Sequence, residues 1–153
     1  MSDSMPAAPP HYSPPGWFTT NVFNRVVDLL MRLGVSVRGS RILRVRGRKS
    51  GRPYTTPVNL LTIDGTRYLV SPRGNTQWAR NLRAAGGGEL MLGRRVDRFQ
   101  AEEVPEADRI PILRAYLRLW KMEVGTFFGG VDADSPDSEF ARIAPRHPVF
   151  VIR

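Results

Sequence analysis

The spacing of apolar residues separates helical from extended segments along the chain. From Phe18 to Leu33 the apolar positions recur at helical intervals, and Gly34 follows, so an amphipathic helix is predicted over 17–34. Its polar stripe carries too many charges for a membrane span. The same periodicity predicts helices over 76–85 and 108–122 and a short one over 135–143, with Asn75 and Asp108 as N-caps and Gly86–Gly88 ending the first.

Elsewhere the apolar residues alternate, which predicts strands. These cover 35–37 with 42–45, then 54–63, 67–71, 89–92, 96–104 and 148–152. Asp64-Gly65 predicts a two-residue hairpin turn of the primed type, and Gly93-Arg94 a second hairpin turn. Because hairpins dominate and serial βαβ units are lacking, we expect an α+β fold, a small antiparallel barrel with peripheral helices.

The first part of the chain differs from the rest in composition. Residues 1–16 hold five prolines and little to bury, which is typical of a disordered tail. A basic start followed by an apolar run is lacking, so a secretory signal is not expected. The predicted organisation is a tail over 1–16, a helix over 17–34 and a barrel domain over 35–153. The helix either packs on the domain, covers an apolar pocket or lies on a membrane surface, and Trp17 and Phe18 at its start are compatible with both of the last two.

Composition narrows the chemistry. The 153 residues suffice for one domain, and they include no cysteine and only two histidines, His11 and His147. Thiol catalysis, cysteine zinc modules and disulfide scaffolds are excluded, and no metal site is predicted. Two distant histidines do not make a convincing nucleophile and base, so an enzyme built on this chain is expected to rely on a cofactor.

The charge is strongly positive. Lys and Arg number 23 against 14 Asp and Glu, a net charge of +9, and all the cations except Lys49 and Lys121 are arginine. An anionic partner is therefore expected, since the guanidinium fork suits carboxylate and phosphate. From Arg38 to Arg52 seven cations occur without an acid. This stretch lacks interleaved aromatic residues and any known nucleic-acid motif, so nucleic acid is not the predicted partner.

Two polar segments are candidates for binding an anion. In Gly47–Pro53 glycines flank Arg48, Lys49 and Ser50 on a loop between strands, which suits a phosphate or carboxylate, although a solvated basic turn has the same composition. The spacing is not that of a Walker loop. Ser71–Leu82 leads into a helix whose N-terminus favours an anion, and Asn81 in mid-helix suggests a specific hydrogen-bond partner.

A late cluster of aromatic residues has two interpretations. Tyr116, Trp120, Phe127 and Phe128 are either part of the core or the wall of a pocket for a flat ring. The sequence pattern alone does not separate these interpretations.

These segments together resemble the deazaflavin-dependent nitroreductase and quinone reductase family, which has a split β-barrel similar to that of FMN-binding proteins. The resemblance is clear from Arg41 to Phe99 and holds in outline beyond. It depends on Gly47–Gly51, Pro57, the Asp64-Gly65 hairpin, Ser71–Gly74 and Trp78–Leu82 in the family's order, and the final strand also fits.

The resemblance implies binding of coenzyme F-420, a polyanionic 8-hydroxy-5-deazaflavin, with FMN the less favoured cofactor on the same fold. It implies hydride transfer from the reduced coenzyme to a small-molecule acceptor, either a quinone, a nitroaromatic or an enone. The implied cofactor residues are Arg48, Lys49 and Ser50 at the phosphate end, with Thr56, Pro57, Val58, Asn59, Ser71, Arg73, Gly74, Trp78 and Asn81 along the rest.

The implied acceptor wall consists of Tyr116, Trp120, Phe127 and Phe128, and Tyr116 is the candidate catalytic hydroxyl. The chain departs from the family's pattern at Ala79, where better-known members carry tyrosine, and at Phe127 and Phe128. Because phenylalanine cannot donate a proton, the identity of the proton donor and the choice of acceptor stay open.

One branch of this family is thought to bind lipids. The alternative function is therefore a membrane-associated lipid- or fatty-acid-binding barrel without cofactor chemistry. Under the reductase hypothesis we expect a cytoplasmic protein, with the helix over 17–34 as a candidate for contact with the inner face of the membrane.

Overall fold

A computed structural model describes residues 39–153, apart from the side chains of 121–123. The predicted tail over 1–16, the predicted helix over 17–34 and the extended segment predicted over 35–37 lie outside the described residues. The described elements are β1 (Ser40–Arg46), β2 (Pro53–Ile63), β3 (Thr66–Val70), α2 (Gln77–Ala85), β4 (Gly87–Leu92), β5 (Arg95–Glu103), α3 (Ile110–Val124), α4 (Asp137–Ile143) and β6 (Val149–Ile152), with short 3-10 helices η1 (Glu106–Asp108), η2 (Gly125–Phe128) and η3 (Ala144–Arg146).

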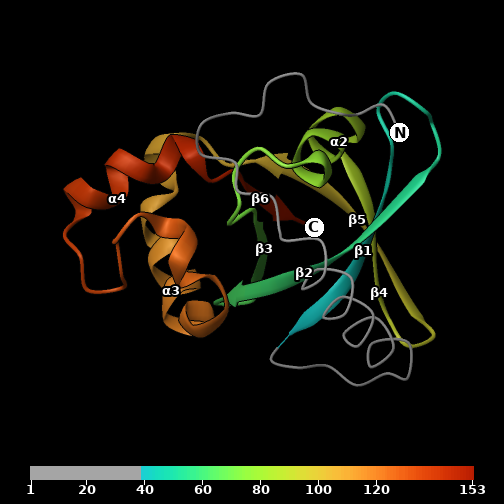
Figure 1. Cartoon of the computed structure of the whole chain (residues 1–153). Helices are drawn as coiled ribbons and strands as arrows, with labels where there is room; N and C mark the ends of the chain where they lie inside the picture. The colour runs from blue at the N-terminus through green and yellow to red at the C-terminus, as the bar shows by residue number, and fades with distance from the viewer. Residues whose placement is uncertain (1–38) are drawn as a thin grey trace.

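The strands form a closed antiparallel barrel in the order β1-β2-β3-β6-β5-β4. Pairing of Ile42 with Met91 joins β1 to β4. The last strand joins the two halves of the barrel, because Ile152 pairs with Arg67 of β3 on one side and with Ala101 of β5 on the other. Figure 1 shows the barrel and α2 on one side of the molecule and α3 and α4 on the other. The predicted α+β barrel with peripheral helices is confirmed.

Glycine fixes two of the turns that shape the barrel. Asp64 and Gly65 both have positive φ, 49° and 83°, as the predicted primed hairpin turn requires. Gly86 ends α2 in the left-handed conformation with φ of 75°. The two glycines after it begin β4, where a Cβ on Gly87 would lie 2.5 Å from the Phe99 carbonyl oxygen and one on Gly88 would lie 2.8 Å from that of Arg44. Only glycine allows this close approach of the strands.

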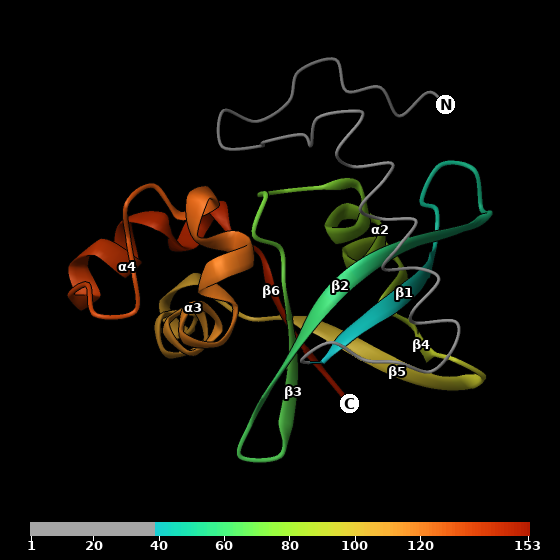
Figure 2. The same ribbon diagram turned by 60° about the horizontal axis from the view of Figure 1, so that its bottom comes forward.

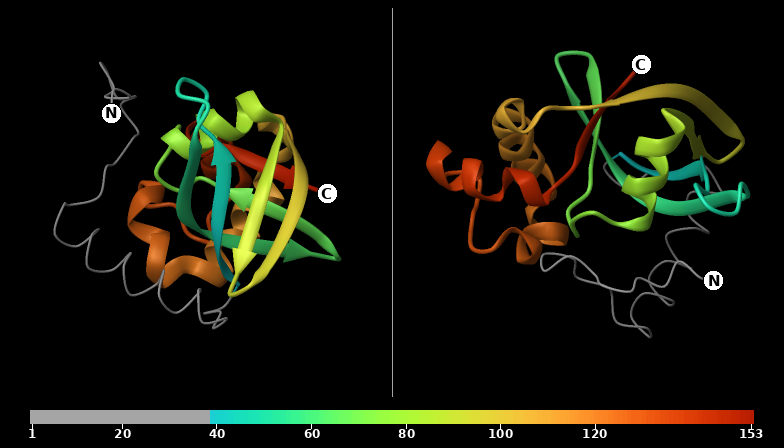
Figure 3. Two further views of the ribbon diagram at one scale, coloured as in Figure 1. Left: turned by 90° about the vertical axis from the view of Figure 1, so that its right-hand side faces the viewer. Right: turned by 90° about the horizontal axis from the view of Figure 1, so that it is seen from above.

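Alternation along the strands supplies two hydrophobic cores. In β6, Phe150 and Ile152 point into the barrel, whereas Val149 and Val151 pack toward the helices. The interior of the barrel is filled by side chains from all six strands, and Trp78 and Leu82 of α2 pack into the same cluster. Figure 2 and the left panel of Figure 3 show α2 against one end of the barrel.

The second core lies between the outer face of β2, β3 and β6 and the layer formed by α3 and α4. It contains large apolar side chains, among them Leu113, Tyr116, Trp120, Phe128 and Phe140. At about 25 cal/mol per Å² of buried apolar area, aromatic side chains of this size supply much of the stability of such a layer. The right panel of Figure 3 shows α3 and α4 beside the barrel.

Two predicted helix caps were wrong. Thr76, not Asn75, caps α2, because its Oγ1 accepts a hydrogen bond from the Ala79 amide at 3.4 Å. Asp108 lies inside η1, and α3 begins only at Ile110, so Asp108 does not cap that helix.

Among residues 39–153, no helix is long and apolar enough to cross a membrane.

Candidate functional site

The loop between β1 and β2 is a compact turn that presents cations. The Gly47 amide donates to the Arg52 carbonyl at 2.7 Å, and the Gly51 amide donates to the Gly47 carbonyl at 2.9 Å. Gly51 has φ of 73°, a conformation that favours glycine. Lys49, Ser50 and Arg52 are exposed at the tip. The loop therefore has a defined shape with its polar side chains accessible.

Asn81, a residue of α2, binds the β1–β2 loop to this helix. Its amide oxygen accepts from the Arg48 amide at 3.1 Å and from the Arg48 guanidinium at 2.8 Å. The same guanidinium donates to Gln77 Oε1 at 2.9 Å. Asn81 is only 2% exposed, so a buried mid-helix amide has the specific partner that the sequence suggested. The two polar segments, far apart in sequence, thus lie together.

The partners of Arg48 are neutral, and this decides the charge of the loop. Amide oxygens orient a guanidinium without neutralising it. Within residues 39–153, the ion pairs to carboxylates do not include Arg46, Arg48 or Arg52. These three arginines therefore keep their positive charge, and an anion near them would meet charge-assisted donors.

The loop from β3 to α2 is held from inside. The Ser71 hydroxyl is fully buried, donates to the Gly74 carbonyl at 2.5 Å and lies 3.1 Å from Thr76 Oγ1. The Ser71 amide donates to the Pro148 carbonyl at 2.9 Å. Gly74 has φ of 100°. Ser71 therefore shapes the loop, and Gly74 provides the sharp turn that brings the chain into α2.

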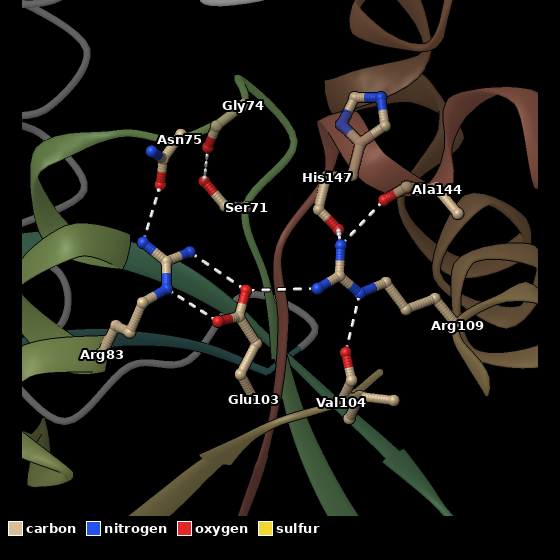
Figure 4. A network of polar contacts seen from close by, with 9 residues as sticks. All are labelled: Ser71, Gly74, Asn75, Arg83, Glu103, Val104, Arg109, Ala144 and His147. Carbon is tan, nitrogen blue, oxygen red and sulfur yellow. Dashed lines mark hydrogen bonds and ion pairs between the residues drawn. The ribbon is translucent and has the colours of Figure 1, made fainter. Parts of the chain in front are cut away.

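A chain of ion pairs fixes this loop to the end of β5. Asn75 Oδ1 accepts from Arg83 at 3.1 Å, and Arg83 binds both carboxylate oxygens of Glu103, at 2.7 and 3.0 Å. Figure 4 shows Glu103 between two arginines, with Arg109 on its other side at 3.1 Å. The hydrogen bonds from Arg83 are the main reason that the pKa of Glu103 lies below its usual value.

Arg109 carries the chain of contacts to the C-terminal part of the molecule. It is 5% exposed and donates to the carbonyls of Val104 and Ala144, both at 2.8 Å, and to that of His147 at 3.5 Å (Figure 4). Burial lowers the pKa of its guanidinium, while the Glu103 charge opposes that shift. Through Arg83 and Glu103, this network links Asn75 of the β3–α2 loop to Arg109 and the segment before β6.

The other implied cofactor residues differ in exposure. Thr56 and Pro57 of β2 are half-buried opposite Leu43 and Ile42 of β1. Val58 is buried in the barrel core, and Asn59 accepts a hydrogen bond from Ser40 at 3.4 Å. Trp78 is buried, with its ring centroid 6.1 Å from that of Phe150. Some of the implied cofactor residues thus keep accessible surface, namely Arg48, Lys49, Ser50, Thr56, Pro57 and Arg73. Others are buried and support them, namely Val58, Ser71, Gly74, Trp78 and Asn81.

The aromatic cluster is mostly core. Tyr116, Trp120 and Phe128 are at most 1% exposed, and Phe128 stacks on His147 with ring centroids 4.2 Å apart. Phe127 alone in this set is half-buried, and the Arg73 guanidinium lies over its ring, 4.3 Å from the centroid. In this structure, only Phe127 of the predicted acceptor wall is accessible.

Sequence reasoning did not identify Gln77, Arg83, Glu103 and Arg109. Gln77 stands one helical turn before Asn81, a spacing that places both side chains on one face. The other three belong to different elements, and nothing in their local sequence indicates that they meet.

Within residues 39–153 no cluster of three metal-ligating side chains is present.

Comparison with known proteins identifies the family. The family model described as F420H(2)-dependent quinone reductase matches residues 21–132. The chain belongs to this family. It is a family of oxidoreductases, and its members are named for a deazaflavin coenzyme and a small-molecule acceptor. No curated protein matches the chain.

Solved structures share the fold of this family member at low identity. A structure described as a domain-swapped dimer is 18% identical, with a TM-score of 0.54, and the match covers 88% of this chain and 98% of that one. The protein Atu2129 of unknown function from Agrobacterium tumefaciens is also 18% identical, with a TM-score of 0.53 and coverage of 95% and 58%. An F420-H2 dependent reductase, FDR-A, is 19% identical, with a TM-score of 0.50 and coverage of 78% and 100%.

Proposed function

We propose that this protein binds coenzyme F-420 in its reduced form and uses it to reduce a quinone. Family membership supports the class of reaction. The observation that carries the assignment of the site is the contact of Arg48 with Asn81 and Gln77, which joins the cationic loop to α2. A polyanionic coenzyme needs accessible cations beside a rigid floor, and Arg48 and Arg52, which form no ion pair with a carboxylate among residues 39–153, supply the charge next to α2.

The residues present fit such a coenzyme. Arg48, Lys49 and Ser50 would hold its phosphate end, with Arg52 adding charge at the tip. Thr56, Pro57 and the β3–α2 loop would border the ring system, over a floor supported by Trp78 and Asn81. When bound, the reduced deazaflavin supplies a hydride. The protein's part is to bind, orient and exclude water, because positioning two rings in contact removes most of the entropic cost of such a transfer.

Acceptor choice follows from the chemistry of the accessible wall. Phe127 presents an apolar ring, and Tyr116 is too deeply buried to touch an acceptor in this structure. A quinone forms a stable anion after hydride transfer and takes its proton from water. A nitroaromatic depends more on a protein donor, and enones lie between. We therefore propose quinones as the preferred acceptors among the three classes.

Titration of the pure protein with oxidised coenzyme F-420 tests this function. We expect saturable binding, with FMN bound more weakly. Lys49→Ala and Arg48→Ala should each weaken the coenzyme about tenfold, since a charged hydrogen bond contributes about 1.5–3 kcal/mol. Arg94→Ala, which removes a charge from the exposed β4–β5 turn, is the matched control and should leave the dissociation constant unchanged. Equal affinity in all three variants would remove the loop from the site.

Residues 17–34 extend the proposal to the membrane. An amphipathic segment outside both binding motifs is suited to bring apolar quinones from the inner face of the membrane to a cytoplasmic enzyme. Deletion of residues 1–33 should leave coenzyme affinity within about threefold and lower turnover of long-chain quinones more than that of menadione. Equal losses for long and short quinones would indicate that the segment only supports the fold.

A further inference from the structure

A row of apolar side chains crosses the outer face of the barrel. Ile42 of β1 pairs with Pro57 of β2 on one side and with Met91 of β4 on the other, and Met91 pairs with Val96 of β5. The barrel interior is filled from positions that alternate with these, namely Leu43, Val58, Leu90 and Phe99. Because successive side chains of a strand point to opposite faces, the four paired residues point outward, and we call them the apolar strip.

The apolar strip is separate from both hydrophobic cores. Ile42 at its centre is only 7% exposed, Pro57 and Met91 are half-buried, and Val96 at its edge is 52% exposed. These four residues are absent from the two core clusters of the described chain. Figure 1 shows α3 and α4 on the opposite side of the molecule from β1 and β4, and α2 packs into the barrel interior. A continuous strip of this kind is typical of a surface that another segment covers.

The chain before β1 contains a segment with a matching apolar face. The sequence predicts an amphipathic helix over 17–34. Its second half carries apolar residues at helical spacing, namely Val26, Leu29, Leu30 and Leu33. An isolated helix of this length is only marginally stable in water, so it needs a surface on which to bury that face.

The connection to the barrel places this segment within reach of the strip. Residues 35–38 join it to Gly39, and Ile42 follows three residues later. A connection of this length spans up to about 14 Å when extended, enough to turn the segment back over β1. Eight residues of helix, 26–33, are about 12 Å long, and the four strands of the strip cover about 14 Å. The two apolar surfaces therefore match in length as well as in character.

We propose that the second half of the segment 17–34 docks as a helix along the apolar strip. Its first residues, Trp17 and Phe18, then lie beyond the docked part and are available for the membrane contact proposed above. Since Pro57 belongs both to the strip and to the residues proposed to border the coenzyme, the docked helix would run beside that site. The inference goes beyond the proposed function and does not depend on the identity of the coenzyme.

Hydrogen exchange of the full chain, followed by mass spectrometry, tests the docking. Amides of a helix that is not packed exchange fast, whereas those of a docked helix are protected. We expect protection of residues 26–34 in the wild-type protein, and this protection should not depend on protein concentration or on added lipid.

One substitution on each side of the contact should remove this protection. Leu30→Gln on the helix and Met91→Gln on the strip should each speed exchange of residues 26–34 by about tenfold or more, while the barrel strands stay protected. The matched controls introduce the same residue outside the contact. Arg32→Gln on the polar stripe and Val96→Gln at the edge of the strip should change the exchange less than about threefold.

A disulfide locates the contact without the glutamine variants. The chain has no cysteine, so introduced pairs report a single proximity. Met91→Cys combined with Leu29→Cys, Leu30→Cys or Leu33→Cys should give an intramolecular disulfide on oxidation for at least one pair. Met91→Cys combined with Arg32→Cys, on the opposite face of the helix, should give none.

Fast exchange of residues 26–34 in the wild-type protein would overturn the inference. So would protection that survives both Leu30→Gln and Met91→Gln, because the segment would then pack elsewhere. Protection that increases with protein concentration would assign the strip to a second copy of the chain, and protection that requires vesicles of anionic lipid would assign the segment to the membrane. Either result would also overturn the docking, whereas coenzyme titration tests the proposed function separately.

Discussion

The β1–β2 loop and the segment from Tyr116 to Phe128 are both candidate sites by sequence, but the structure exposes the polar side chains of the first and buries most of the aromatic side chains of the second. The loop presents Lys49 and Arg52 to solvent, and its Arg48 donates to neutral side-chain amides of α2. The aromatic segment buries Tyr116, Trp120 and Phe128 completely. A cation on a short loop has no low-energy buried alternative, whereas an aromatic side chain gains most by burial.

The difference teaches where binding chemistry and stability reside in this molecule. The polar site depends on a few oriented hydrogen bonds between α2 and a loop, whereas the aromatic segment is part of the second core, between the barrel and the layer of α3 and α4. Arg73 of the β3–α2 loop contacts Phe127 of the aromatic segment, so the barrel side and the helical layer touch there. Substitutions in one region should therefore change binding, and substitutions in the other should change stability.

The largest expected effect concerns the core. Phe128→Ala should lower the free energy of unfolding by about 3–5 kcal/mol, the usual cost of removing a buried aromatic side chain. Lys49→Ala should leave it unchanged within error. Urea unfolding followed by circular dichroism measures both. A small loss in Phe128→Ala would mean that η2 is not part of the core.

Asn81 is the point at which one substitution should affect both properties. Asn81→Ala removes an acceptor shared by two half-buried N–H groups of Arg48 and should cost about 1 kcal/mol of stability. Coenzyme affinity should fall as well, since the loop is no longer fixed to α2. Urea unfolding and coenzyme titration are carried out on Asn81→Ala and on Lys49→Ala, and the second variant should change only the affinity for the coenzyme. A loss of stability with unchanged affinity would separate the loop from the site.

Glu103 should confer a pH-dependent part of the stability. Its pKa is lowered in the folded protein by Arg83 first, with Arg109 contributing. Its ionised form therefore stabilises the fold above the unfolded-state pKa of about 4.3, and this contribution is lost as the pH falls below that value.

The substitution Glu103→Gln should accordingly destabilise the protein at pH 7 and less at pH 4. Thermal unfolding at a series of pH values measures the difference from wild type. A difference that stays constant from pH 7 to pH 4 would show that the charge of Glu103 has no stabilising role.

The smallest expected effect distinguishes the two neighbours at the start of α2. Thr76→Ala should cost about 1 kcal/mol, the typical value for an N-cap, and Asn75→Ala less. Thr76→Ser is the control that retains the hydroxyl. Unfolding midpoints in urea measure all three. If Asn75→Ala were the more damaging, the cap would be assigned to the wrong residue.

Most of the fold could be predicted because its signals are local. The alternating strands, the Asp64-Gly65 turn and the glycines after α2 each specify their own element. Asn81 could be singled out because a buried amide in mid-helix is unusual. The cap of α2 was misassigned because Asn75 and Thr76 are both good caps, and only the position of Ser71 favours the second.

The rest depends on contacts between distant residues. Arg83, Glu103 and Arg109 lie on three elements, and their meeting follows from the closure of the barrel. The burial of Tyr116 likewise depends on where α3 packs, because an aromatic position on a helix face is compatible with a core or with a pocket wall. For such residues the sequence limits the possibilities, and tertiary structure decides among them.

Closure of the barrel by β6 has a consequence for how the protein folds. The other five strands precede β6 in the chain, yet β3 and β5 have no partner on their facing edges until it docks between them. An open edge is a template for pairing with another chain, and pairing between distant segments is slow. Closure of the barrel should therefore come late in folding, and until then the edges of β3 and β5 are exposed. A peptide with the sequence of β6 should compete at that stage and not afterwards.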